Sequence, residues 1–238
     1  MLARTQAQRG NVLFLILIAV ALFAALSYAV TQSSRSGGDA SKETNVINTA
    51  SLTQWPNSVR TSTLRLIVGG IAPEDLYYNT PTEFSGSANS YFVGRESRGV
   101  FHPSGGAAPY QRVPANLARD GTDLAWKFNL DFEVPLLGLS GAGYTGNDLI
   151  AFAEGITQSV CDRVNKELHQ YEAATPVIPA GVTINNNRTA LTADPAEPST
   201  QTVLNDGSTP NWFENKAFGC FRNGAAGEFT FYYVLAER

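Results

Sequence analysis

A long uncharged apolar run near the N-terminus is the feature that most constrains this 238-residue chain. Between Arg9 and Arg35 there is no charged side chain, and the apolar run of residues 12–30 is broken only by Ser27 and Tyr28. As a helix at about 1.5 Å per residue, this run spans roughly 28 Å, close to the thickness of the hydrocarbon core of a bilayer. We therefore expect the segment to insert into a membrane.

Basic residues predict the orientation of this segment. Arg4 and Arg9 precede the apolar run, and the first ten residues contain no acid. Because positive charges stay on the cytoplasmic side, we expect the N-terminus in the cytoplasm and everything after Val30 on the far side of the membrane.

Three fates are open to the apolar run. A signal peptidase could cut after Ser27-Tyr28-Ala29, a small-x-small sequence that follows a basic region and an apolar region. The run could also remain as a simple signal anchor. A different peptidase could cut on the cytoplasmic side of the run, after Gly10.

The third fate depends on Gln8-Arg9-Gly10, which lies directly against the apolar Asn11-Val12-Leu13-Phe14-Leu15. This arrangement resembles the short, basic, glycine-ended leader of type IV prepilins and type II secretion pseudopilins. The resemblance implies that residues 1–10 are a leader removed after Gly10 and that Asn11 becomes the methylated N-terminal residue. It also implies that the apolar segment is kept and packs in the core of a filament.

The chain departs from the family pattern at two positions. Family members usually carry Phe at the first mature position and Glu at the fifth, where this chain has Asn11 and Leu15. In the family that glutamate is thought to meet the N-terminal amine of a neighbouring subunit, and an unpaired buried charge costs several kcal/mol. The departure favours a tip or minor subunit, or a divergent branch of pilins, and leaves assembly of this chain alone open.

What the resemblance implies for function is a structural subunit, a major or minor pilin, of a type IV pilus-like or type II secretion-like filament. Such filaments support adhesion, motility, uptake or secretion. The implied partners are copies of the chain or sibling pilins, a prepilin peptidase, and an assembly platform with its ATPase. The chain would cross the inner membrane once before assembly and lie in an extracellular or periplasmic filament afterwards. The alternative is a secreted or membrane-anchored extracytoplasmic binding module, of which an extracytoplasmic enzyme is the weaker version.

Beyond the apolar run, the sequence predicts a stalk and a head. We divide the chain into a leader (1–10), a transmembrane helix (11–34), an amphipathic helix or stalk (35–68) and an extracytoplasmic globular head (69–238). Apolar residues recur every three to four positions over residues 39–66, as in an amphipathic helix. Pro56 should kink this helix or begin a new one, and Gly69-Gly70 should end it.

The sequence pattern of the head is typical of a β-sheet. Turn-forming residues recur between short apolar or aromatic runs, which predicts strands at residues 91–93, 99–102, 126–134 and 229–236. Residues 126–134 alternate apolar and polar side chains, so we expect one dry and one wet face. The expected fold class is α+β, a long N-terminal helix packed on an antiparallel, pilin-like sheet.

One helix and one long loop complete the expected head. A stripe of apolar residues predicts a helix over residues 147–168, capped by Asn147 or Asp148. Residues 172–211 are rich in Pro, Ala, Thr and Asn, which predicts a surface loop with one short strand at 182–184.

Two cysteines in a non-cytoplasmic head predict one disulfide, between Cys161 and Cys220. Closing a loop of about sixty residues contributes at most roughly 4 kcal/mol in the chain-entropy model. The alternative is two buried free thiols. Type IV pilins often carry a C-terminal loop bounded by a disulfide, so the predicted bridge is similar in kind.

The composition argues against several classes of function. With 17 basic and 21 acidic residues the chain has a net charge of -4, which disfavours nucleic-acid binding. Two His and two Cys are too few for zinc fingers or multi-histidine centres, so we expect no metal and no cofactor. Residues 141–146 match G-x-G-x-x-G, but a Pro/Asn-rich segment follows where a parallel strand is needed.

No catalytic residue is expected, and hence no enzyme activity. We expect His102, which precedes a proline at a tight turn, to hydrogen-bond that turn. The loop acids around Asp120 and Asp206 lack the spacing of a full calcium loop. Asn187-Arg188-Thr189 fits a glycosylation sequon, a pattern that occurs often by chance.

Overall fold

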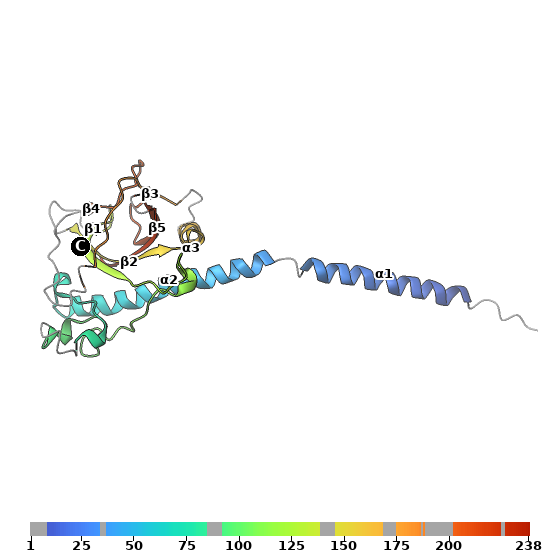
Figure 1. Ribbon diagram of the computed structural model, residues 1–238, viewed down its shortest axis with the longest axis horizontal. Coiled ribbons are helices and arrows are strands. Elements are labelled where there is room, and N and C mark those ends of the chain that lie inside the picture. Colours follow the sequence, from blue (N-terminus) through green and yellow to red (C-terminus); the bar gives the residue numbers. More distant parts are fainter. Residues whose placement is uncertain are drawn as a thin grey trace, which may run out of the picture. The chain divides into compact units, whose positions relative to one another are not determined.

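The computed structural model describes residues 9–33, 37–84, 92–138, 146–168, 175–186, 188, 202–224 and 227–238. The chain divides into two compact units, residues 1–46 and 47–238. The first unit holds the apolar helix α1 (Arg9–Ser33) and the beginning of α2 (Gly37–Val68). The second unit, the head, holds the rest of α2 and a six-stranded sheet (Figure 1).

Helix α2 covers the amphipathic helix expected over residues 39–66, and it ends at the predicted glycines. Pro56 lies inside the helix and does not end it. At the C-terminus, Gly70 has a φ of +96°, and the Ile71 N–H donates to the Leu66 carbonyl at 3.2 Å. This left-handed turn favours glycine because a side chain there would be strained.

Six strands form one mixed, curled sheet in the order β3-β5-β6-β2-β1-β4. Their bounds are β1 (Lys127–Glu133), β2 (Asp148–Ile156), β3 (Val177–Ile178), β4 (Thr202–Val203), β5 (Phe218–Asn223) and β6 (Phe229–Ala236). With helices outside the sheet, the fold class is α+β, as predicted.

The expectation of a purely antiparallel sheet is wrong at both edges. The four central strands pair antiparallel, but β4 runs parallel to β1 and β3 runs parallel to β5. Parallel neighbours need long connections, and each of these pairs is separated by tens of residues of chain. The edge strands come from the long segment between β2 and β5, which a pattern of short hairpins does not foresee.

Strand β1 confirms the strand predicted at residues 126–134, but its two faces differ from the expectation. The pairing with β2 shifts register between Asn129 and Phe132. Trp126, Phe128 and Leu130 therefore join one core cluster, whereas Phe132 and Val134 join the other. Asn129 and Glu133, expected on a wet face, are 0% and 5% exposed. Side chains alternate between the two faces of a strand, so the extra residue of a bulge turns the apolar side chains that follow it to the opposite face of the sheet.

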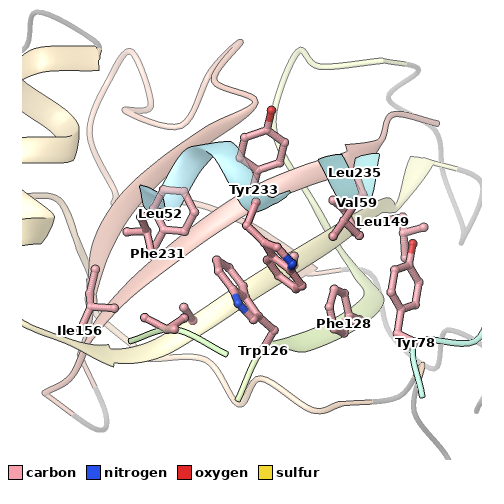
Figure 2. Packing of buried hydrophobic residues seen from close by; sticks show 14 of the residues in the cluster. Leu52, Val59, Tyr78, Trp126, Phe128, Leu149, Ile156, Phe231, Tyr233 and Leu235 are labelled. Carbon is pink, nitrogen blue, oxygen red and sulfur yellow. The ribbon is translucent and has the colours of Figure 1, made fainter. Parts of the chain in front are cut away.

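Both faces of the sheet are covered by apolar side chains. On one face Leu52, Trp55 and Val59 of α2 are buried, and Figure 2 shows Leu52 and Val59 in one cluster with Trp126, Phe128 and Phe231. A second cluster covers the opposite face and includes Ile150, Phe152, Trp212, Phe213, Phe221 and Tyr232. Strands β2 and β6 supply alternate residues to the two clusters, so they form the centre of the head.

The helix predicted over residues 147–168 is wrong in its first half. Residues 148–156 form the central strand β2, and helix α3 (Gln158–Arg163) begins only after Thr157, followed by a short π-helical turn, η7 (Val164–Leu168). Nearly every residue of β2 is buried, so its apolar spacing also fits a strand covered on both faces. Gly155, with a φ of +87°, lies at a register shift.

Two other predicted strands are absent from the described residues, and four strands of the sheet were not predicted as strands. Phe92–Gly94 is a turn, and Tyr91 lies outside the described residues. Gly99 makes an isolated parallel bridge with Tyr77, and residues 100–102 are bends. In this region the chain makes short 3₁₀ turns instead: η1 (Pro73–Asp75), η2 (Pro81–Phe84), η4 (Glu96–Arg98) and η5 (Ala115–Leu117). Strand β6 matches its prediction. Strand β5 was not predicted, β2 was predicted as a helix, and β3 and β4 lie in the segment predicted as a loop.

The segment expected to be a surface loop contributes to the head. Strands β3 and β4 arise from it, and Ile178, Ile184 and Leu204 are buried. The strand predicted at 182–184 is replaced by side-chain pairing. The Val182 N–H donates to Asn223 Oδ1 at 3.1 Å, and Asn223 Nδ2 donates back to the Val182 carbonyl at 2.6 Å. An asparagine amide therefore takes the place of a neighbouring strand.

Candidate functional site

Helix α1 is long and apolar enough to span a membrane. Its window of residues 12–31 has a mean hydropathy of 2.7 and contains no buried residue. Its large apolar side chains, from Val12 to Val30, are between 40% and 74% exposed. Twenty residues at about 1.5 Å per residue cover roughly 30 Å, the thickness of a hydrocarbon core.

The apolar side chains surround α1 on all sides. Leu13, Phe14, Leu15, Ile16, Leu17 and Ile18 are consecutive, so they point in every direction around the helix axis. Near the C-terminal end of the helix, the Thr31 hydroxyl donates to the Ser27 carbonyl at 2.6 Å. That bond satisfies the hydroxyl within the helix, which suits an apolar environment. A helix of this kind needs lipid or other apolar helices around it.

The residues predicted to be processed lie at the start of α1. Gly10 and Asn11 are part of the helix backbone, and Arg9 is its first residue. Leu15, at the fifth position after Gly10, is 59% exposed. The first eight residues of the predicted leader lie outside the described residues. The helix therefore continues through the expected cleavage point without a break.

The predicted disulfide between Cys161 and Cys220 is present. Both residues are fully buried, and their Cα atoms are 5.3 Å apart. The bridge joins the first turns of α3 to the middle of β5, across 59 residues of sequence. It therefore links α3, which directly follows the central strand β2, to β5, which forms much later in the chain.

The polar loop residues that the sequence singled out make local turn contacts. The His102 Nδ1 accepts the Ser104 N–H at 3.2 Å, as expected for a turn histidine. Asp120 Oδ1 accepts the Thr122 N–H at 3.0 Å, and Asp206 Oδ1 accepts the Ser208 hydroxyl at 2.7 Å. Within the residues that the structure describes, no group of three or more His, Cys, Asp or Glu side chains is placed to hold a metal ion.

The glycine motif at residues 141–146 does not have the context of a dinucleotide site. Its first five residues lie outside the described residues, as does Asn187 of the sequon. Gly146 is followed by strand β2, which pairs antiparallel with β1. A dinucleotide fingerprint requires a helix at that point and a parallel second strand, so the motif joins two antiparallel strands instead.

Asp148 is a buried carboxylate that sequence reasoning placed at a helix cap. Its Oδ2 accepts the Val134 N–H at 2.8 Å, and its Oδ1 accepts the Arg238 N–H at 3.3 Å. The pKa of this carboxyl is raised to about 7, chiefly by burial; the two N–H donors lower it, and the nearby Glu133 and Glu237 add to the increase. The only sequence signal for this buried carboxyl was an acidic residue at the start of an apolar run.

Compared with known proteins, the chain matches no family model, no curated protein and no solved structure.

Proposed function

We propose that this chain is a structural subunit of a type IV pilus-like or type II secretion-like filament. The observation that carries the proposal is α1, a helix with apolar side chains on all sides and no buried residue in its apolar window. Fully burying one Leu, Ile, Val or Phe side chain contributes roughly 1.5–3 kcal/mol, so such a helix strongly favours a bilayer or a bundle of like helices. The helix lies in the bilayer before assembly and in a bundle of like helices, the filament core, after assembly.

The boundary at Gly10 supports retention of the helix over its removal. Arg9 and Gly10 adjoin the apolar run directly, as in the leaders of prepilins. Cleavage after Gly10 removes the basic residues Arg4 and Arg9 and leaves Asn11 as the N-terminal residue. Everything from Asn11 onward then remains one piece, with α1 ahead of a disulfide-bonded head. The N-terminus faces the cytoplasm and the head lies beyond the inner membrane.

The leucine at position 15 affects the contacts through which such subunits would associate. Without a glutamate at this position, packing does not depend on a buried ion pair between subunits. Close approach of apolar helices then supplies the contact, helped by small residues in the run, Ala19, Ala21, Ala24 and Ala25. The partners are copies of this chain or sibling pilins, served by a prepilin peptidase and by an assembly platform with its ATPase.

The decisive experiment is the intact mass of the protein purified from cell membranes. We expect a mature chain that lacks residues 1–10 and carries one added methyl group on Asn11. Gly10→Ala should block this maturation, because the peptidase needs the glycine. Gly38→Ala, in α2, is the matched control and should mature normally. A mature chain that begins at Val30, or normal maturation of Gly10→Ala, would overturn the proposal.

The second candidate is a secreted or membrane-anchored binding module, favoured by Ser27-Tyr28-Ala29 at the end of the apolar run. Ala29→Leu separates the two candidates, because it removes the small residue that a signal peptidase requires. Under the filament proposal this variant is still cut after Gly10. If Ala29→Leu alone abolishes maturation, the chain is an exported module.

A further inference from the structure

A groove lined by uncharged residues lies on the surface of the head, between α2 and the segment around Pro109. Its volume is about 340 Å³, at the small end of the range for ligand sites of roughly 300–1,000 Å³. It is lined by Ser51, Gln54, Trp55, Ser58, Pro109 and Gln111. Positions 51, 54, 55 and 58 are three or four residues apart and so form a single stripe along α2.

The floor of this groove is held rigidly. The Trp55 Nε1–H donates to the Pro109 carbonyl at 2.7 Å, which ties the two walls together. The Trp55 ring is only 7% exposed and packs on Trp126, with ring centroids 4.9 Å apart. Ser58 Oγ donates to the Trp55 carbonyl at 2.7 Å. These contacts hold Trp55 in one position, so the base of the groove is already ordered before a ligand binds, and less entropy is lost on binding.

The chemistry of the walls selects a class of ligand. All six lining residues are uncharged, and amides and hydroxyls can each donate and accept hydrogen bonds. A charged ligand would lose hydration without gaining a counter-charge from the lining, and a purely apolar ligand would leave the amides without partners. Pro109 adds exposed apolar surface, whereas the buried Trp55 ring supports the floor from below.

We propose that this groove binds a neutral saccharide of one or two rings. Sugar hydroxyls, which both donate and accept, match the exposed amides of Gln54 and Gln111, and the C–H face of a sugar ring matches the exposed apolar ring of Pro109. Because the groove is small, we expect dissociation constants on the order of 1 mM. The inference is independent of filament assembly, since an anchored monomer carries the same groove.

The test uses the full chain in a polyoxyethylene detergent, whose headgroup is not a sugar. Saturation-transfer NMR is recorded with maltose, lactose and N,N′-diacetylchitobiose, and with glucuronic acid as the charged probe. We expect transfer to at least one neutral disaccharide and none to the acid. Gln54→Ala combined with Gln111→Ala should weaken binding by roughly tenfold, since each variant removes a hydrogen-bonding amide.

Gln158→Ala is the matched control, because Gln158 is exposed at the start of α3 and does not line the groove. It should bind like the unmodified chain, and equal thermal melts of all variants should show that the head is intact. No transfer to any neutral disaccharide, or undiminished transfer in the double variant, would overturn the inference. A change in self-association of the double variant without saccharide binding would also overturn it, and would assign the groove to contacts between chains.

Discussion

Asn165 and Cys220 exchange two hydrogen bonds across the head. The Asn165 Nδ2 donates to the Cys220 carbonyl at 2.8 Å, and the Cys220 N–H donates to Asn165 Oδ1 at 2.9 Å. The side-chain amide thus takes the place of a strand at the free edge of β5, beside the point where β3 pairs with Arg222. Because Cys161 lies four residues before Asn165, one helical stretch holds Cys220 by a covalent bond and by two hydrogen bonds.

Removing the disulfide should destabilise the head. In the variant with Cys161→Ser and Cys220→Ser, we expect the free energy of unfolding to fall by about 2–4 kcal/mol, because the unfolded chain loses a loop constraint across some sixty residues. Urea unfolding of the full chain in detergent measures the change. Unfolding curves of the unmodified chain that coincide with and without a reductant would contradict the prediction.

Replacing Asn165 should cost nearly as much without touching the cysteines. Asn165→Ala leaves the buried N–H and carbonyl of Cys220 without their partners, and we expect a loss of about 2 kcal/mol. The control is Lys166→Ala, because Lys166 is the exposed neighbour. Combining Asn165→Ala with the cysteine variant gives a double-mutant cycle, in which we expect non-additivity, because both contacts hold the same strand. Strict additivity would mean that they act independently.

The stability of the head should depend on pH through Asp148. Its pKa is about 7 in the folded head against an ordinary value of 3.8, so the folded state binds the proton more tightly. The free energy of unfolding should therefore be highest at acidic pH. It should fall as the pH rises from about 4 to 7, by up to about 4 kcal/mol at 1.4 kcal/mol per pKa unit.

The check on Asp148 is urea unfolding at pH 5 and pH 8. Asp148→Asn should flatten this difference, because the amide does not ionise. Asp162→Asn, at an exposed position on α3, should leave the difference unchanged. A head that is equally stable at both pH values before substitution would count against a raised pKa at Asp148.

Trp55 should anchor α2 to the sheet. Its ring is buried among Trp126, Phe101 and Phe128, with centroid distances of 4.9, 5.9 and 6.5 Å. Trp55→Ala opens a cavity in this cluster, and we expect a loss of about 3–5 kcal/mol in thermal or urea unfolding. Gln54→Ala, one residue earlier and exposed, should change stability by less than about 0.5 kcal/mol. Similar losses for both variants would mean that α2 is held mainly by other contacts.

Local patterns predicted the features that depend on neighbouring residues in the chain. The uncharged run of residues 12–30 predicted α1, Gly69-Gly70 predicted the end of α2, and the aromatic run of residues 229–236 predicted β6. The pairing of Cys161 with Cys220 followed from there being only two cysteines. The groove beside Trp55 gave no sequence signal, because its two walls are about fifty residues apart.

Sequence alone therefore determined where the apolar helix lies, where α2 ends and which segments are apolar enough for the core, since side-chain hydropathy and backbone preference act over a few residues. Only the tertiary structure decided that residues 148–156 are a strand, that Phe132 faces away from Phe128, and that Asp148 is buried. Those outcomes depend on what covers each face. A run that is apolar at nearly every position fits a helix and a strand equally well until neighbours such as β1 and β6 pair with its backbone.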